Sequence, residues 1–254
     1  MFSLRQRQTS TTRAPRIWLV VSVVAQIGIV GPPARADVAW ATVANPGQAI
    51  SIQRNSHATA GAWVARYHGV QKPTESNRSL IAALWAYMQV CECNSPGHPV
   101  DWNISLGWKT LCRGRGYSYV PVKERCRYSE RDDETADFDS YVERIHQNLP
   151  VILTFCYDLE ARRGLGQAYR RVASCSSMVG IGHLVCDGQK FLICHDGLAS
   201  GQASPALADR VSPSDLGLST DGTPWGQSGT SLYRWNGSYT NLVMVFIGHP
   251  KRQN

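Results

Sequence analysis

The sequence predicts an α+β fold in which helices come first along the chain and an antiparallel sheet follows. Apolar residues recur at helical spacing as far as residue 145, whereas from residue 151 onward they form short, β-branched runs of strand length. With 254 residues, of which 43% are hydrophobic and 18% charged, the chain can bury a core and is neither disordered nor fibrous. One compact domain, or one domain with a long insertion, is therefore expected.

Four segments have the spacing of amphipathic helices. The first is residues 57–68, which Asn55-Ser56 precedes and Gly69 closes, and its apolar residues at i, i+3, i+4 and i+7 are Ala60, Trp63, Val64 and Tyr67. The others lie at about residues 80–90, at residues 104–113 and at residues 138–145, where Leu149-Pro150 stops the last one.

Strand signals follow the last helix. Residues 151–155 form a short apolar run, and a second such run lies at residues 242–247. Between them, residues 182–186 and 191–196 flank Asp187-Gly188, a sequence typical of a tight β-hairpin turn. These four runs predict the antiparallel sheet.

The first 36 residues have the pattern of a secretory signal peptide. An arginine-rich start precedes an apolar run, residues 17–30, and the small-x-small triplet Ala34-Arg35-Ala36. The run is shorter than the ~20 residues of a membrane-spanning helix, so no membrane span is expected after cleavage. We expect cleavage before Asp37, export by the general secretion route, and a secreted or periplasmic domain of residues 37–254.

Charge and composition characterise that domain further. Five of the 26 Lys and Arg residues, but none of the 19 Asp and Glu residues, lie in residues 1–36, so residues 37–254 have a net charge of +2. A nearly neutral domain lacks the excess of positive charge that is typical of nucleic-acid-binding domains, and no nucleic-acid partner is expected. Residues 197–230 are rich in Gly, Ser, Pro and Asp, which predicts a long ordered loop or insertion.

Eight cysteines lie in residues 37–254, and an even number in an exported chain predicts disulfides. We favour a bond between Cys156 and Cys175, because it would join the two ends of a polar segment between strands. Cys91-x-Cys93 precedes His98, but no second close pair of Cys or His completes a zinc signature. No metal and no other cofactor is therefore expected.

The sequence lacks the phosphate-binding loop, the dinucleotide-binding glycine motif, the His-Glu-x-x-His motif and the Gly-x-Ser-x-Gly elbow. A His and an Asp on the predicted hairpin remain. Pairing across an even-numbered loop puts His183 and Asp196 on the same face, where the Asp could orient the His as a general base. The alternative is a core histidine and a turn residue before Gly197.

Three motifs follow one another in a set order. Ser56-His57-Ala58-Thr59-Ala60 opens a helix, Pro150-Val151-Ile152-Leu153 starts a strand, and Gly182-His183-Leu184-Val185 precedes His195-Asp196-Gly197. In this order, residues 48–197 resemble the C39-like peptidases of the papain-like superfamily. The resemblance implies a papain-like fold with N-terminal helices packed on a C-terminal antiparallel sheet, and a peptide or protein substrate or ligand.

The resemblance also implies site residues. Ser56 stands in the place of the family's Cys nucleophile, with His183 as base and acid and Asp196 orienting it. Gln48 and Gln53, eight and three residues upstream of Ser56, are the two candidates for the glutamine that stabilises the oxyanion.

Serine is a departure that decides the expected activity. A helix N-terminus and a nearby His can deprotonate a thiol, whose pKa starts at about 8.5, but a hydroxyl is far less acidic. Serine is also a preferred helix N-cap. The sequence therefore predicts an exported C39-like pseudopeptidase or a weakly active peptide hydrolase. The alternative is a non-catalytic protein, either a peptide-binding module or a structural protein of the envelope or cell surface.

Overall fold

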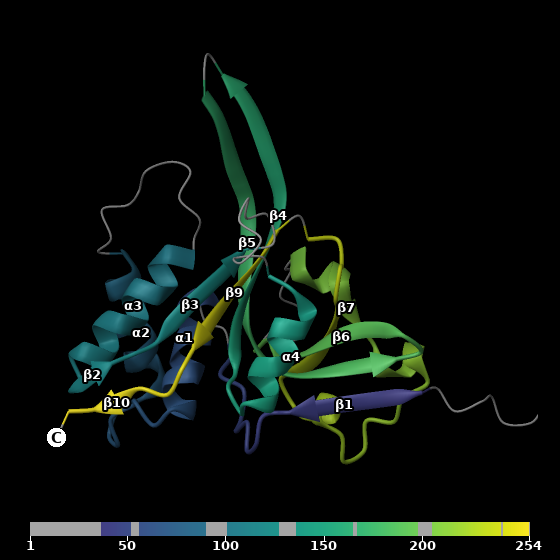
Figure 1. The fold of residues 1–254 in the computed structure, drawn as a ribbon, viewed down its shortest axis with the longest axis horizontal. Helices are drawn as coiled ribbons and strands as arrows, with labels where there is room; N and C mark the ends of the chain where they lie inside the picture. Colours follow the sequence, from purple (N-terminus) through teal and green to yellow (C-terminus); the bar gives the residue numbers. More distant parts are fainter. Residues whose placement is uncertain are drawn as a thin grey trace, which may run out of the picture. The chain divides into compact units, whose positions relative to one another are not determined.

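The computed structural model describes seven stretches of the chain: residues 37–51, 56–89, 101–126, 136–164, 167–197, 205–239 and 241–253. Within them the protein is α+β, as expected, with four α-helices and a mostly antiparallel sheet (Figure 1). The expected signal peptide, the Cys91-x-Cys93 pair and His98 lie outside the described residues. In the described part, no helix is long and apolar enough to cross a membrane.

The four predicted helices are confirmed: α1 Ser56–Tyr67, α2 Asn77–Gln89, α3 Asp101–Arg113 and α4 Phe138–His146. Side-chain caps begin two of them. Ser76 Oγ accepts a hydrogen bond from Ser79 N (3.1 Å) at α2, and the Asp137 carboxylate accepts one from Ser140 N (2.6 Å) at α4. Each cap satisfies a backbone donor that the helix itself leaves unpaired.

The strands form one large and one small sheet. They are β1 Val38–Thr42, β2 Tyr117–Tyr119, β3 Val122–Cys126, β4 Val151–Gly164, β5 Gln167–Cys186, β6 Gln189–His195, β7 Arg210–Val211, β8 Thr230–Arg234, β9 Asn241–Ile247 and β10 Lys251–Arg252. The large sheet has the order β3-β9-β4-β5-β6-β8-β7, with β1 also paired to β5, and β10 pairs with β2. The runs predicted at residues 151–155 and 182–186 are parts of the much longer strands β4 and β5.

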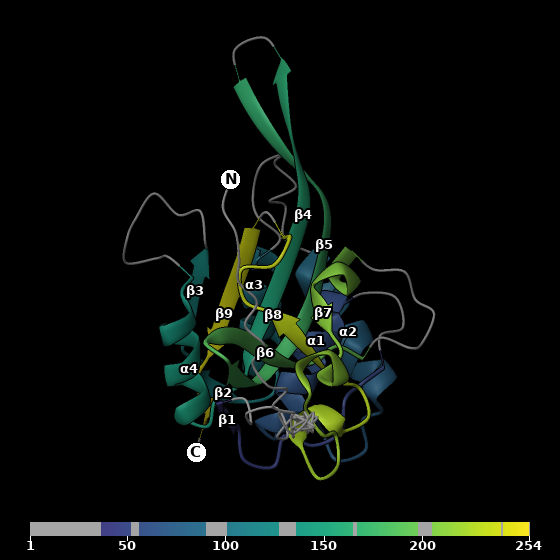
Figure 2. The same ribbon diagram turned by 90° about the vertical axis from the view of Figure 1, so that its right-hand side faces the viewer.

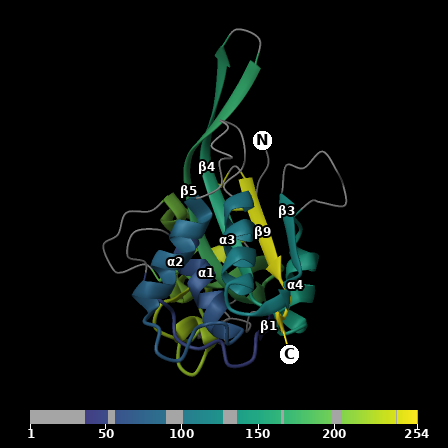
Figure 3. The same cartoon turned by 90° about the vertical axis from the view of Figure 1, so that its left-hand side faces the viewer.

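Helices cover both faces of the large sheet. Helices α1 and α3 pack on one face, with α2 packed against both of them (Figure 3), and α4 packs on the other face (Figure 1). Helix α1 is buried over residues 58–65, five of which are Ala or Gly, so its backbone can approach its neighbours closely. A Cβ added to Gly61 would lie 3.4 Å from the Leu84 side chain of α2.

The turn between β5 and β6 is the predicted two-residue hairpin. Cys186 pairs with Gln189, and the turn residues Asp187 and Gly188 both have positive φ (49° and 73°), as a type I′ turn requires. Further along this pair of strands the register shifts between Gly180 and Gly182. The Tyr141 hydroxyl of α4 donates a hydrogen bond to the Gly182 carbonyl at this bulge (2.7 Å).

Replacement of Tyr141 by Phe should lower the free energy of unfolding by about 1–3 kcal/mol, because it leaves a buried carbonyl without its donor. Tyr141 is fully buried, and a Cβ on Gly180 would lie 2.6 Å from its hydroxyl oxygen, so the ring has no room to move. Urea unfolding measures the change, with Tyr87→Phe on α2 as the matched control. Equal losses in the two variants would contradict a structural role for this hydrogen bond.

The segment predicted as a long loop, residues 197–230, is more regular than expected where it is described. From residue 205 onward it contains β7 and three short 3₁₀ helices: Pro205–Asp209, Pro213–Leu216 and Pro224–Gly226. Proline fixes φ near the helical value at each start, which favours a short turn over a longer element. The buried Asp209 anchors the segment by accepting hydrogen bonds from Tyr157 Oη (3.1 Å) and Ser238 N (2.5 Å).

The predicted disulfide between Cys156 and Cys175 is present. The two cysteines face each other across β4 and β5. Cys112, Cys186 and Cys194 are buried free thiols. Because disulfides persist mainly in oxidising compartments, this bond is compatible with an extracytoplasmic location.

Candidate functional site

The N-terminus of α1 lies against the middle of β5. Ser56, the first residue of α1, accepts a hydrogen bond on its Oγ from the backbone N–H of Ser177 (3.0 Å). The helix thereby brings the candidate nucleophile against the sheet, as the resemblance implied. The β5 residue that it meets, however, is Ser177 and not His183.

A small polar cluster surrounds this contact. Ser177 is 2% exposed, and its hydroxyl hydrogen-bonds to His57 Nδ1 of α1 and to Thr154 Oγ1 of β4 (2.7 Å). Burial lowers the pKa of His57 from 6.5 to about 4. His57 is therefore neutral at pH 7, and it gains a proton only in clearly acidic solution.

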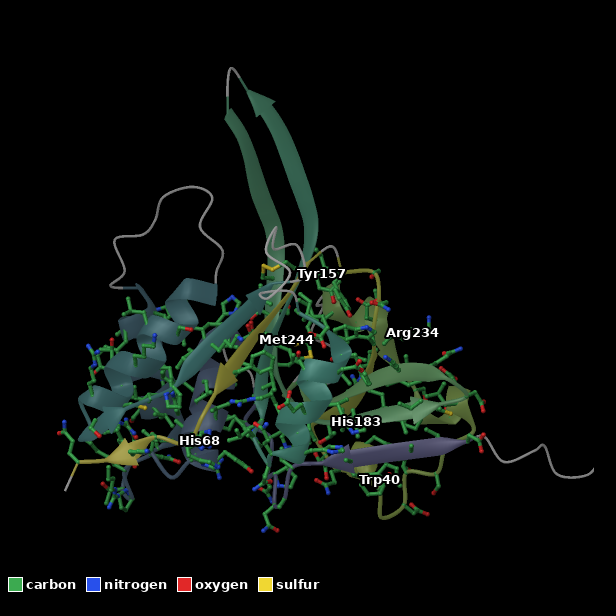
Figure 4. All side chains as sticks on the ribbon, viewed as in Figure 1. Trp40, His68, Tyr157, His183, Arg234 and Met244 are labelled. Atoms are coloured by element: carbon green, nitrogen blue, oxygen red, sulfur yellow. A yellow bond between two sulfur atoms is a disulfide. The ribbon has the colours of Figure 1, made fainter. Side chains whose placement is uncertain are left out.

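His183 lies far from this cluster, which corrects the expected arrangement. It is six residues beyond Ser177 on β5, or about 20 Å along an extended strand. It pairs with Ala41 of β1 and Leu192 of β6, and Figure 4 shows its side chain beside β1. No hydrogen bond between His183 and Ser56 can span such a distance.

The surroundings of His183 fit a core histidine. Its Nε2 lies 3.2 Å from His146 Nε2 of α4, and the ring of Phe138 meets it edge-on at 6.0 Å. Burial lowers the pKa of His183, and the neighbouring His146 lowers it further. Its interactions tie α4 to β5, as the alternative interpretation of the sequence proposed.

Asp196 is also separated from His183. The residue opposite His183 is Leu192, which is four residues before Asp196 and about 13 Å away along the strand. Asp196 is 3% exposed, accepts a hydrogen bond from Tyr233 Oη (2.9 Å) and lies 3.9 Å from Arg210 Nε. Side-chain alternation constrains the face on which a residue lies but not its distance along the strand, so the expectation that His183 and Asp196 share a face did not exclude this separation.

Gln48, the first of the two glutamine candidates, is not placed beside Ser56. Gln48 lines an open groove of about 380 Å³ with Trp63 and Arg66, near the C-terminal end of α1. Trp63 is seven residues beyond Ser56, or about 10 Å along the helix axis. Gln53 lies outside the described residues.

The sequence analysis assigned no role to His195, which directly precedes Asp196. His195, at the end of β6, is 4% exposed, its Nδ1 is 3.0 Å from Thr230 Oγ1, and its ring centroid lies 5.1 Å from that of Trp63. Burial is the main reason that its pKa is lowered. No local sequence pattern indicates that His195 lies near α1, because it is brought there only by the pairing of Val179 with His195.

Very little space remains between α1 and these strands. A cavity of about 10 Å³ lies among Thr59, Trp63, Ser177, His195 and Asp196. Such a volume holds about one water molecule and no part of a peptide. No group of three or more His, Cys, Asp or Glu side chains within the described ranges is arranged to hold a metal ion.

Comparison with known proteins adds no relative: no family model matches the chain, and a search of curated proteins finds no significant match. The arrangement at the N-terminus of α1 must therefore be interpreted from its own chemistry. The Ser177 hydroxyl hydrogen-bonds there to the Thr154 hydroxyl and to the neutral imidazole of His57, and the Ser56 hydroxyl accepts a hydrogen bond from the Ser177 backbone N–H.

Proposed function

We propose that this protein is an exported pseudopeptidase of papain-like fold, which binds a peptide or protein ligand without cleaving it. The order of the elements supports the likeness. A helix N-terminus carrying Ser56 packs on an antiparallel strand, and an acidic residue, Asp196, follows the next strand of the sheet. In the family that the sequence resembles, the nucleophile, the base and the orienting residue come in this order.

The observation that carries the proposal is the contact between Ser56 and Ser177. A catalytic base must lie next to the nucleophile, and the β5 residue next to Ser56, which contacts it through its backbone N–H, is Ser177. A serine hydroxyl cannot act as the general base that another hydroxyl requires. Both positions of the catalytic pair would thus have lost their chemistry.

His57 does not compensate for the missing base. Its Nδ1 contacts Ser177 Oγ, but its pKa of about 4 makes it a weak acceptor of a proton at neutral pH. Ser177 is also too buried for a substrate carbonyl to reach, and the neighbouring cavity holds only about one water. The polar cluster therefore serves to fix α1 on the sheet.

A papain-like fold that has lost its catalytic residues can still bind a ligand, and the resemblance implies that this ligand is a peptide or a protein. The disulfide supports a location outside the cytoplasm. A purely structural protein of the envelope or cell surface is the second candidate, and it differs by having no soluble ligand.

Rebuilding the catalytic pair tests the proposal. The triple variant Ser56→Cys, His57→Ala, Ser177→His moves one imidazole from α1 to β5, so the total side-chain volume of the cluster changes little. An epoxide inhibitor directed at cysteine peptidases should label position 56 of this variant at least tenfold faster than position 56 of Ser56→Cys alone. The wild type should not react with a fluorophosphonate at Ser56 or Ser177.

Controls separate the site from the other thiols and from misfolding. Labelling is mapped to position 56 by peptide mass spectrometry, and the variant with Ala at position 56 together with His57→Ala and Ser177→His gives the background. Adding His183→Ala to the triple variant should leave the labelling unchanged. If the wild type reacts with the fluorophosphonate, the protein is an active hydrolase; if the folded triple variant gains no reactivity, the papain-like assignment is overturned.

A further inference from the structure

Strands β4 and β5 continue beyond the sheet as a two-stranded arm, which we define as residues 157–164 and 167–174. Figures 1 and 2 show it projecting from the other strands. Pairing of β4 with β9 ends at Cys156 and Asn241, and pairing of β5 with β6 starts only at Val179. The arm strands remain paired to each other over about 25 Å.

The arm therefore has two open edges. Among the described residues, no third strand pairs with either side of it. Each edge carries a row of backbone N–H and C=O groups that a further strand could complete. An isolated two-stranded ribbon is marginally stable in water, so an added strand would also stabilise the arm.

The charge of the arm differs from that of the remaining domain. Residues 161–172 contain no Asp or Glu and four arginines: Arg162, Arg163, Arg170 and Arg171. With Asp158 and Glu160 nearer its base, the whole arm has a net charge of +2, whereas the rest of residues 37–254 has 17 Lys and Arg residues, 17 Asp and Glu residues and a net charge of zero. The positive charge of the domain is thus concentrated near the end of the arm.

The register brings the four arginines into a short stretch of the ribbon. Ala161 pairs with Arg170, Arg162 with Tyr169 and Glu160 with Arg171. Pairing of two arms from two copies would put eight arginines into one ribbon, and like charges across strands are destabilising. The charge therefore disfavours self-association through these edges and favours an acidic partner.

We propose that the arm docks an extended, acid-rich segment of a partner protein, which adds as a strand to one of its open edges. Backbone hydrogen bonds supply the pairing and the carboxylates meet the arginines, the mode known as β-augmentation. A polyanion without a peptide backbone could meet the arginines but could not complete the edge. The open edge is the reason to choose a peptide segment over a nucleic acid or an anionic lipid.

A fluorescent ten-residue peptide of alternating Glu and Thr is the probe, and its binding is measured by fluorescence anisotropy. It should bind the wild type, and its affinity should fall as ionic strength rises. Alternating Lys and Thr reverses the charge, and alternating Glu and Pro keeps the charge but cannot pair as a strand. Each of these two peptides should bind at least tenfold more weakly.

The protein variant Arg162→Gln, Arg163→Gln, Arg170→Gln, Arg171→Gln should lose at least tenfold in affinity for the Glu-Thr peptide. The control variant with Arg66→Gln, Arg78→Gln, Arg234→Gln and Arg252→Gln has the same net charge, and its four positions are exposed elsewhere. Equal losses in the two variants would overturn the proposal. Equal binding of the Glu-Pro peptide, or tighter binding of single-stranded DNA of the same charge, would show a contact between charges alone and overturn it as well.

Discussion

Acidification from pH 7 to pH 4 should lower the free energy of unfolding by about 3 kcal/mol through His57 alone. Burial lowers the pKa of this histidine to about 4 in the folded protein, whereas its ordinary value is 6.5. Between these two values the unfolded chain binds more protons than the folded one, so stability falls as the pH falls. The stabilisation is fully present above pH 6.5 and is lost by about pH 4.

His57→Asn tests this prediction, because the Asn amide can occupy the place of Nδ1 beside Ser177 Oγ but cannot titrate. Urea unfolding of the wild type and the variant between pH 4 and pH 7 should give stability curves that lie close together at neutral pH and diverge as the pH falls, because only the wild type loses the contribution of His57. The pKa of His68 is also lowered to about 4, first by burial and then by His249 and Arg144, so a residual slope should persist in the variant. Parallel curves for the two proteins would show that His57 is not the group that titrates.

The helices could be predicted from the sequence because each has a periodic apolar face and a local boundary signal. Ser76 and Asp137 cap α2 and α4, and Asn148 and Leu149-Pro150 mark the end of α4. The hairpin turn was equally local, since Asp187-Gly188 determines its type. Such signals depend on neighbouring residues, and they are therefore legible in one sequence.

The full length of β4 and β5 could not be predicted. The apolar run ends at Phe155, and residues 157–174 contain Asp, Glu, Arg and Gly in place of a buried stripe. Backbone pairing and the disulfide hold these residues in register, and neither interaction requires a periodic pattern of apolar residues in the sequence. The sequence interpretation consequently ended the first strand at Phe155 and began the second only at Gly182.

The arrangement of the site residues could not be predicted for a related reason. A Gly-His pair at residues 182–183 fitted the family motif, but the neighbour of Ser56 on β5 is set by how far the strand extends. Ser177 lies in a segment that the sequence interpretation had not assigned to a strand. Long-range register, which decides which residue of β5 meets α1, is a property of the whole sheet.

Removal of the disulfide by Cys156→Ser and Cys175→Ser should lower the free energy of unfolding by about 3 kcal/mol, because the bond closes a loop of about 20 residues in the unfolded chain. Cys186→Ser is the matched control, since Cys186 is a buried free thiol on the same strand. Guanidinium unfolding under non-reducing conditions measures both changes. A loss no larger than that of the control would mean that the bond contributes little beyond the burial of its sulfur atoms.

The same variant also separates the arm from the core. Cys156 and Cys175 form the pair at the base of the arm, and Tyr157 follows directly with its hydroxyl on Asp209 (Figure 4). Without the disulfide, amides of residues 158–173 should exchange with solvent at least tenfold faster, because the ribbon beyond this point has no core of its own. Amides of β6 should change only as much as global stability changes. If both groups accelerate equally, the disulfide stabilises the fold as a whole and does not hold the arm in particular.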